Sequence, residues 1–177
     1  AEGFDYDFTD QLDWMEDSEE EVKTYRHAVI GFWINCVRKG SRYTMAYLLN
    51  KFPLLVNALE WIFVMEFWED QWGYVGDTAL MIATKNGDLK MVKFLLEHDA
   101  DVDDVNAYGW TALMYAVDAR KVEIVRVLAD FGADPLVDGE DRGAMSAGET
   151  AIDMIASRRE DGEGGRWEDA AIATILG

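Results

Sequence analysis

The chain has 177 residues, half of them hydrophobic, and its 35 acidic and 16 basic side chains give a formal net charge of −19. This hydrophobic content excludes a chain that is disordered throughout, and the length is sufficient for one domain with its own core. The charge argues against nucleic acid and against an anionic membrane surface, because both need a surplus of Lys and Arg. It favours a protein partner with a basic or mixed apolar surface, although the same charge could serve solubility alone.

The first 21 residues are predicted to be an acidic arm, because they hold ten acidic and no basic side chains. Aromatic side chains are interleaved with the carboxylates, among them Phe4, Tyr6 and Trp14. Such a segment cannot bury enough apolar surface alone to offset the entropy lost on ordering. It is therefore expected either to dock on a partner or to fold back on the domain predicted at residues 22–177.

Residues 25–53 are predicted to form two helices, at 27–37 and 44–49, joined by a turn at Arg38-Lys39-Gly40. Cys36, the only cysteine, lies in an apolar stretch and is expected to be buried. A single cysteine excludes an intrachain disulfide and a thiolate zinc site.

Residues 54–75 are rich in tryptophan and are predicted to insert an additional helix at 54–67. Trp61, Met65, Trp68 and Trp72 follow one another at spacings of four, three and four, which places them on one helical face. That face is either core or a second partner surface. The apolar stretch at 52–68 contains two Glu residues and is shorter than the roughly 20 residues of a membrane span, so no transmembrane segment is predicted.

A repeat begins at Gly76, where the octapeptide GDTALMIA is matched 33 residues later by GWTALMYA at Gly109. Each copy, at 76–108 and 109–141, is predicted to contain two short amphipathic helices. In the first copy these are residues 78–85 and 89–98, separated by a turn in which Gly87 adopts the left-handed conformation. Thr78 and Thr111 are suited to cap the first helices.

This pattern resembles the ankyrin repeat. The resemblance implies an all-α solenoid of helix-turn-helix units with short hairpin loops, which binds a protein partner and is not an enzyme. It also makes residues 25–53 a degenerate first repeat and 142–177 a C-terminal capping repeat with loops. Departures from the family pattern are Met81 and Met114 in place of His, and Arg120 where the preceding repeat has Gly87. The turn at Arg120 is therefore expected to be either strained or built differently.

Neither catalysis nor a cofactor or metal is predicted. The two histidines, His27 and His98, form no recognisable catalytic arrangement, and His98 is expected to cap the end of a helix. The aspartates at 99, 101, 103 and 104 resemble a calcium loop only briefly, because Asp104 and Trp110 occupy the positions where an EF-hand needs Gly and Glu.

The resemblance places partner contacts on the hairpin tips and the exposed side of each first helix, and Tyr108 and Trp110 are the favoured residues. The alternative for Trp110 is packing against Tyr74 or the neighbouring hairpin. The full predicted set is Tyr74, Asp77, Lys85, Tyr108, Trp110, Met114, Tyr115, Asp118 and Glu149, with a secondary surface at Trp61, Trp68, Trp72, Phe4, Tyr6 and Trp14.

A second hypothesis is a structural subunit of a larger complex, membrane-embedded or organellar, anchored by the acidic arm and the Trp-rich helix. No compartment is predicted, although a soluble protein inside the cell or an organelle is favoured over a secreted one.

Overall fold

The computed structural model describes residues 19–58, 76–138, 150–160 and 167–176. These residues form helices that pair in chain order, and a 3-10 helix, η1 (Pro53–Asn57), follows the first pair. The pairs are α1 (Glu19–Arg38) with α2 (Arg42–Lys51), α3 (Ala79–Asn86) with α4 (Leu89–Leu96), α5 (Ala112–Asp118) with α6 (Val122–Asp130), and α7 (Ala151–Glu160) with α8 (Trp167–Leu176).

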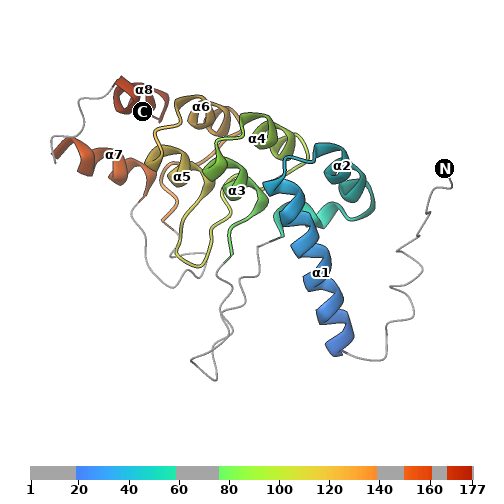
Figure 1. The fold of residues 1–177 in the computed structure, drawn as a ribbon. Helices are drawn as coiled ribbons and strands as arrows, with labels where there is room; N and C mark the ends of the chain where they lie inside the picture. The colour runs from blue at the N-terminus through green and yellow to red at the C-terminus, as the bar shows by residue number, and fades with distance from the viewer. Residues whose placement is uncertain (1–18, 59–75, 139–149, 161–166, 177) are drawn as a thin grey trace.

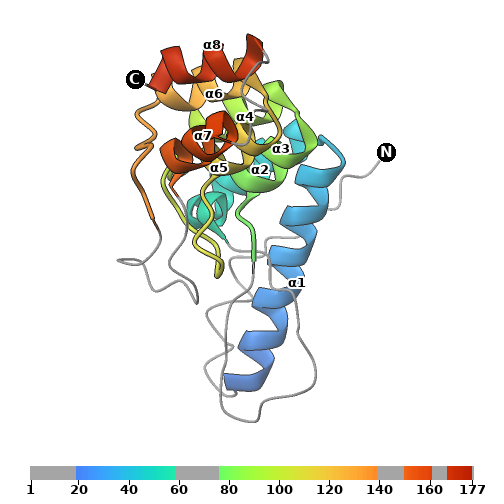
Figure 2. The ribbon, with the colours of Figure 1, turned by 90° about the vertical axis from the view of Figure 1, so that its left-hand side faces the viewer.

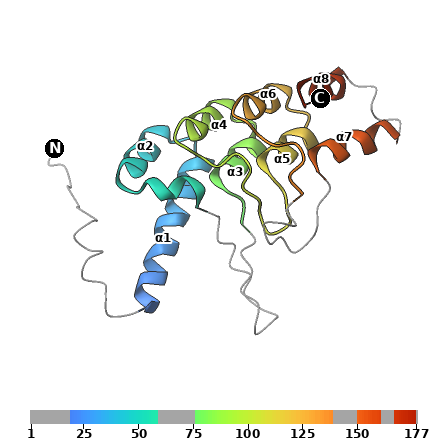
Figure 3. The same cartoon turned by 180° about the vertical axis from the view of Figure 1, so that it is seen from behind.

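The helix pairs stack into two layers (Figure 1). The first helices α1, α3, α5 and α7 form one layer, and α2, α4, α6 and α8 form the other, as the view from behind also shows (Figure 3). One continuous core, from Trp33 in α1 to Ile172 in α8, lies between them. The predicted all-α solenoid is therefore confirmed. Within the described residues, no helix is both long and apolar enough to cross a bilayer.

Two threonines cap the first helices of the central units, as predicted. The Oγ1 atoms of Thr78 and Thr111 accept the backbone N–H groups of Met81 and Met114 at 3.2 Å in each case. The methionine sulfurs accept the threonine N–H groups in return, at 3.4 Å. This reciprocal arrangement is a capping box, in which a methionine sulfur replaces the side chain of the usual Glu or Gln. It satisfies two backbone amides per helix while both methionines stay in the core.

Left-handed backbone recurs at two equivalent places in each central unit. Gly87 and Arg120, 33 residues apart, have φ of 73° and 53°, while Asp99 and Gly132, also 33 apart, have φ of 64° and 88°. Of the two alternatives for the turn at Arg120, the left-handed, strained one is present. Because glycine occupies only one member of each pair, the fold imposes this conformation even where a side chain opposes it.

Neighbouring units are joined by side chains that cap the preceding first helix. Lys121 Nζ donates to the carbonyls of Thr84 and Lys85, at 3.0 and 2.7 Å, at the end of α3. Arg158 of α7 donates to the carbonyls of Val117 and Asp118, at 2.8 and 3.1 Å, at the end of α5. These bonds satisfy carbonyls that a helix leaves without partners, and they fix the offset between units. Burial lowers the pKa of the Lys121 ammonium.

The C-terminal unit is held by a buried carboxylate. Asp169 of α8 is 2% exposed and accepts from Arg120 Nε at 3.1 Å, with an Arg158 nitrogen 3.6 Å away. A buried charge is tolerated only when it is paired. The ion pair with Asp169 offsets the free-energy cost of the left-handed conformation at Arg120. A glycine at this position would relieve the strain but could not bind Asp169.

The N-terminal unit departs from the sequence predictions in two ways. α1 begins at Glu19 rather than at residue 27, so the last three residues of the predicted arm lie in the helix. The α-helix predicted at 54–67 is wrong at its start, because residues 53–57 form the 3-10 helix η1 and Ala58 is extended. Pro53 at the first position favours such a short turn. The remainder of that helix lies outside the described residues.

Replacing Asp99 with glycine is expected to stabilise the protein. Relief of left-handed strain contributes about 1–2 kcal/mol, and the extra freedom of glycine in the unfolded chain offsets about 0.5–1 kcal/mol of it. Glu97→Gly is the matched control, because it removes the same charge two residues earlier at a φ of −67°. Urea unfolding should give a free energy of unfolding for Asp99→Gly about 1 kcal/mol or more above that of Glu97→Gly. Equal values would contradict the strain assigned to Asp99.

Candidate partner-binding site

The hairpin between α4 and α5 is organised by the side chain of Asn106, which is only 4% exposed. Its Oδ1 accepts the backbone N–H groups of Tyr108 and Trp110, both at 3.0 Å. Its own backbone N–H donates to the carbonyl of Trp110 at 3.1 Å, and its carbonyl accepts from Gly109 at 2.9 Å. An Asn side chain can mimic a backbone turn in this way, so Asn106 sets the path of the loop that presents Tyr108 and Trp110.

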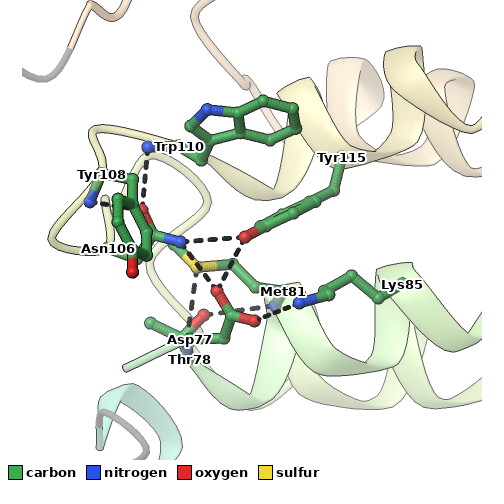
Figure 4. A network of polar contacts seen from close by, with 8 residues as sticks. All are labelled: Asp77, Thr78, Met81, Lys85, Asn106, Tyr108, Trp110 and Tyr115. Carbon is green, nitrogen blue, oxygen red and sulfur yellow. Dashed lines mark hydrogen bonds and ion pairs between the residues drawn. The ribbon is translucent and has the colours of Figure 1, made fainter. Parts of the chain in front are cut away.

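The amide of Asn106 also joins this hairpin to the preceding unit (Figure 4). Its Nδ2 donates to Asp77 Oδ1 at 2.8 Å and to the Tyr115 hydroxyl at 2.9 Å. The Tyr115 hydroxyl donates in turn to Asp77 Oδ1 at 3.0 Å, and Lys85 Nζ binds Asp77 Oδ2 at 2.7 Å. Asp77 therefore accepts from three side chains on three segments, α3, the hairpin and α5.

Aromatic rings cover this polar cluster. The Trp110 and Tyr115 rings lie 4.9 Å apart between centroids, at an interplanar angle of 47°. Lys85 Nζ stands 4.8 Å from the Tyr115 ring centroid, a cation–π distance. Burial, and secondly the nearby Asp77 carboxylate, raise the pKa of the Tyr115 hydroxyl. The phenol is thus held neutral, as a hydrogen-bond donor to Asp77.

Five of the residues predicted for partner binding are brought together here: Asp77, Lys85, Tyr108, Trp110 and Tyr115. Tyr108 is the most accessible of the three aromatic residues in this group, with 57% of its surface exposed. Trp110 is half-buried and packs on Tyr115 within its own unit, rather than standing fully exposed.

The prediction that Met114 contacts a partner is wrong. Met114 was expected on the exposed side of α5, but it is 1% exposed because its sulfur completes the cap at Thr111. A side chain in the core cannot contact a partner in this conformation. Asp118, at the end of α5, has a 58% exposed side chain that pairs with Arg158 at 3.0 Å.

The other predicted contact residues lie outside the described part of the chain. These are Tyr74 and Glu149 of the main surface, and Trp61, Trp68, Trp72, Phe4, Tyr6 and Trp14 of the secondary one. They remain predictions, as does the anchoring role proposed for the arm and the Trp-rich segment.

The acidic residues Asp101 and Asp103 accept hydrogen bonds from backbone N–H groups. Asp101 Oδ1 accepts the N–H of Asp103 at 3.0 Å, and Asp103 Oδ1 accepts the N–H of Asp134 in the next hairpin at 2.9 Å. Asn57 Oδ1 forms the corresponding bond to the N–H of Asp101 at 2.9 Å. His98 Nδ1 lies 2.7 Å from the Phe94 carbonyl, which confirms its predicted place at the end of a helix.

Asn106 lies outside the octapeptide that marks each repeat, so the repeat pattern gives no indication of its role. The available signal was its position three residues before Gly109, an Asn-x-x-Gly arrangement typical of a turn.

Comparison with known proteins identifies the pattern. The family described as "Ankyrin repeats (3 copies)" matches residues 34–139. A protein of Oryctolagus cuniculus, "Ankyrin repeat, SAM and basic leucine zipper domain-containing protein 1", is 36% identical over 89 residues, and the match covers 45% of this chain and 19% of that protein. The same protein from Otolemur garnettii is 46% identical over 56 residues, or 32% of this chain and 12% of the relative. This chain thus matches about a fifth or less of the length of these relatives.

Two solved structures are similar in fold. The ankyrin-repeat protein EF0377 has a TM-score of 0.53 and 25% identity, covering 81% of this chain and 61% of that one. The structure of the yeast ribosomal protein Rps3 in complex with its chaperone Yar1 gives a TM-score of 0.54 and 22% identity, with coverage of 78% and 89%.

Replacing Asn106 with alanine should lower the free energy of unfolding by about 3 kcal/mol, because two hairpin amides and the Asp77 carboxylate lose a buried partner. Urea unfolding followed by circular dichroism measures the change. Asn50→Ala, at an exposed position of α2, is the control and should stay within about 0.5 kcal/mol of the unmodified protein. A similarly small effect at Asn106 would contradict its organising role.

The raised pKa of Tyr115 predicts a pH dependence. The folded state holds the phenolic proton more tightly than the unfolded chain, so its stability contribution is complete below the ordinary tyrosine pKa of about 10 and is lost as the pH rises above that value. Tyr115→Phe removes this contribution. Urea unfolding between about pH 8 and 11 should show parallel curves up to about pH 9 and a steeper loss in the unmodified protein above it, by up to about 1.4 kcal/mol per pH unit. Parallel curves throughout would contradict the assignment.

Proposed function

The chain belongs to the ankyrin-repeat family, and we propose that it binds a protein partner through the surface formed by Tyr108, Trp110 and Tyr115 at the junction of the two central units. Ankyrin repeats are generally non-catalytic modules of protein–protein interaction. The observation that carries the proposal is the Asn106 cluster, which holds Tyr108 and Trp110 on a preformed loop and joins that loop to Tyr115 of α5.

Preorganisation supports this assignment. The loop bearing Tyr108 is fixed by four hydrogen bonds to Asn106, so little conformational entropy remains to be lost when a partner binds. Tyr and Trp contribute large contact areas with few rotatable bonds, and both are enriched in the energetically dominant positions of interfaces. Tyr108 exposes 57% of its surface although other side chains fill the core, so folding alone does not explain its position.

Charge around this loop indicates the chemistry of the partner. Residues 97–111 include Glu97, Asp99, Asp101, Asp103 and Asp104 but neither Lys nor Arg. Glu97 is the C-terminal cap residue of α4, and the other four lie in the segment that leads from α4 into the hairpin (Figure 1). A partner segment with Arg or Lys next to apolar side chains would meet carboxylates and aromatic faces together.

Alanine substitution of Tyr108 tests the proposal with little risk to the fold, since the ring is mainly exposed. The full chain is used to capture partners from an extract of its source, and each captured protein is quantified by mass spectrometry at low and high salt. A partner bound at this site should be recovered at least tenfold less by Tyr108→Ala, and its binding should weaken with salt.

Phe131→Ala is the matched control, because Phe131 is also an exposed aromatic residue of a central unit, at 47%. It should leave the recovery unchanged. If Tyr108→Ala and Trp110→Ala both retain every partner while remaining folded, the binding surface lies elsewhere.

A further inference from the structure

The first helical unit carries a charge opposite to that of the rest of the chain. Residues 22–59 contain no acidic side chain, whereas the protein as a whole has more than twice as many acidic as basic residues. The basic residues of this segment are Lys23, Arg26, Arg38, Lys39, Arg42 and Lys51. A basic island in a chain of net charge −19 needs an explanation other than solubility, because each cation reduces the net charge.

The outer side of α2 combines this charge with exposed aromatic rings. Tyr43 is 97% and Tyr47 57% exposed, while Met45 and Leu49 on the opposite side of the helix are buried in the core. Tyr43, Tyr47 and Lys51 follow at intervals of four, so they share one face. Lys39 lies in the turn before α2, and Arg42 is the first residue of α2, next to Tyr43. We call these five residues the α2 face.

This face lies at the end of the stack. α2 is the first helix of its layer, with α1 and η1 as its neighbours, and the next layer member is α4 (Figures 1 and 3). Nothing in the core requires Tyr43 or Tyr47, and two large rings beside three cations form a surface suited to an acidic segment with aromatic side chains.

We propose that the α2 face is the docking site of the chain's own acidic arm, residues 1–18. The arm holds seven acidic residues and no basic one, and its Phe4, Tyr6, Phe8 and Trp14 alternate with them. Carboxylates pair with Lys39, Arg42 and Lys51, and arm aromatic rings pack against Tyr43 and Tyr47. Each class of side chain in the arm thereby finds its complement on the α2 face.

The length of the arm is sufficient for this contact. The arm joins the fold at Glu19, and α1 from Glu19 to Arg38 spans about 30 Å at 1.5 Å per residue. α2 begins at Arg42, four residues after α1 ends, and packs against α1, so the α2 face lies about one length of α1 from the attachment point. Eighteen extended residues reach about 60 Å. Figure 2 shows that the N-terminal end of α1 extends away from the stack. Residues 1–18 must therefore span about the length of α1 to reach the α2 face.

Covalent attachment favours this occupant over an acidic partner. A tethered segment is present at an effective concentration in the millimolar range, so contacts that are weak individually are made for much of the time. An acidic partner must displace the arm, which makes the α2 face selective for ligands that bind more tightly than the arm does.

Paramagnetic relaxation in the whole 177-residue chain tests the docking. A nitroxide is attached to Thr9→Cys, in a Cys36→Ala background that leaves one reactive thiol, and the amide signals of the ¹⁵N-labelled chain are measured. The signals of Arg42 to Lys51 should lose more than half of their intensity at 50 mM salt and recover at 1 M salt, where the Debye length falls to about 3 Å.

A charge-reversal pair identifies the surface. Lys39→Glu with Arg42→Glu should reduce the relaxation effect at least threefold. Lys90→Glu with Lys93→Glu is the matched control, since both residues are exposed on the neighbouring helix α4 and the change in net charge is the same. The control pair should retain the effect, and Tyr43→Ala with Tyr47→Ala should weaken it.

Three results would overturn the proposal. The first is the absence of relaxation on α2, and the second is an equal loss of the effect in both charge-reversal pairs. The third is an effect between molecules, seen when nitroxide-bearing protein without ¹⁵N is mixed with ¹⁵N-labelled protein that carries no nitroxide. The last would show that a second copy occupies the α2 face, and the first would leave the face to an acidic partner.

Discussion

The structure depends on side chains that reach from one helical unit to the backbone of a neighbouring unit. Lys121 and Arg158 bind carbonyls at the ends of α3 and α5, while Asn57 and Asp103 accept amides from the hairpin that follows each of them. A unit of two short helices is too small to be stable alone, so its stability comes from these bonds and from the shared core. Because each bond is between units, it also fixes how far each unit is displaced along the stack.

The surface that we propose for partner binding depends on this fixed relative position of the units. Asp77 precedes α3, Asn106 lies in the following hairpin and Tyr115 belongs to α5, so their hydrogen bonds close only when the two central units have one relative position. The cluster therefore stabilises the junction and presents Tyr108 and Trp110 at the same time. A substitution that weakens the junction is expected to affect binding and stability together, and only the exposed ring of Tyr108 separates the two.

Charge is distributed along the solenoid in a way that separates two surfaces. The central hairpin is acidic, whereas residues 22–59 are basic without exception among their charged side chains. Like-charge repulsion disfavours contact between the arm and the central hairpin, and attraction favours the first unit. Such segregation allows a basic partner at the centre and an acidic segment at the end without competition between them.

The sequence by itself determined the repeat unit, the helical class and the threonine caps at Thr78 and Thr111. All of these depend on interactions within a few residues, and the 33-residue period makes them visible twice. Only the tertiary structure decided that Met114 is buried as a cap partner, and that Asn106, Asp77 and Tyr115 meet. Asp77 and Tyr115 are 38 residues apart, and their contact depends on how two units stack, which no local pattern specifies. The bond from Asn57, at the end of the 3-10 helix, to the amide of Asp101 was likewise decided by stacking, because the two residues are 44 apart in the chain.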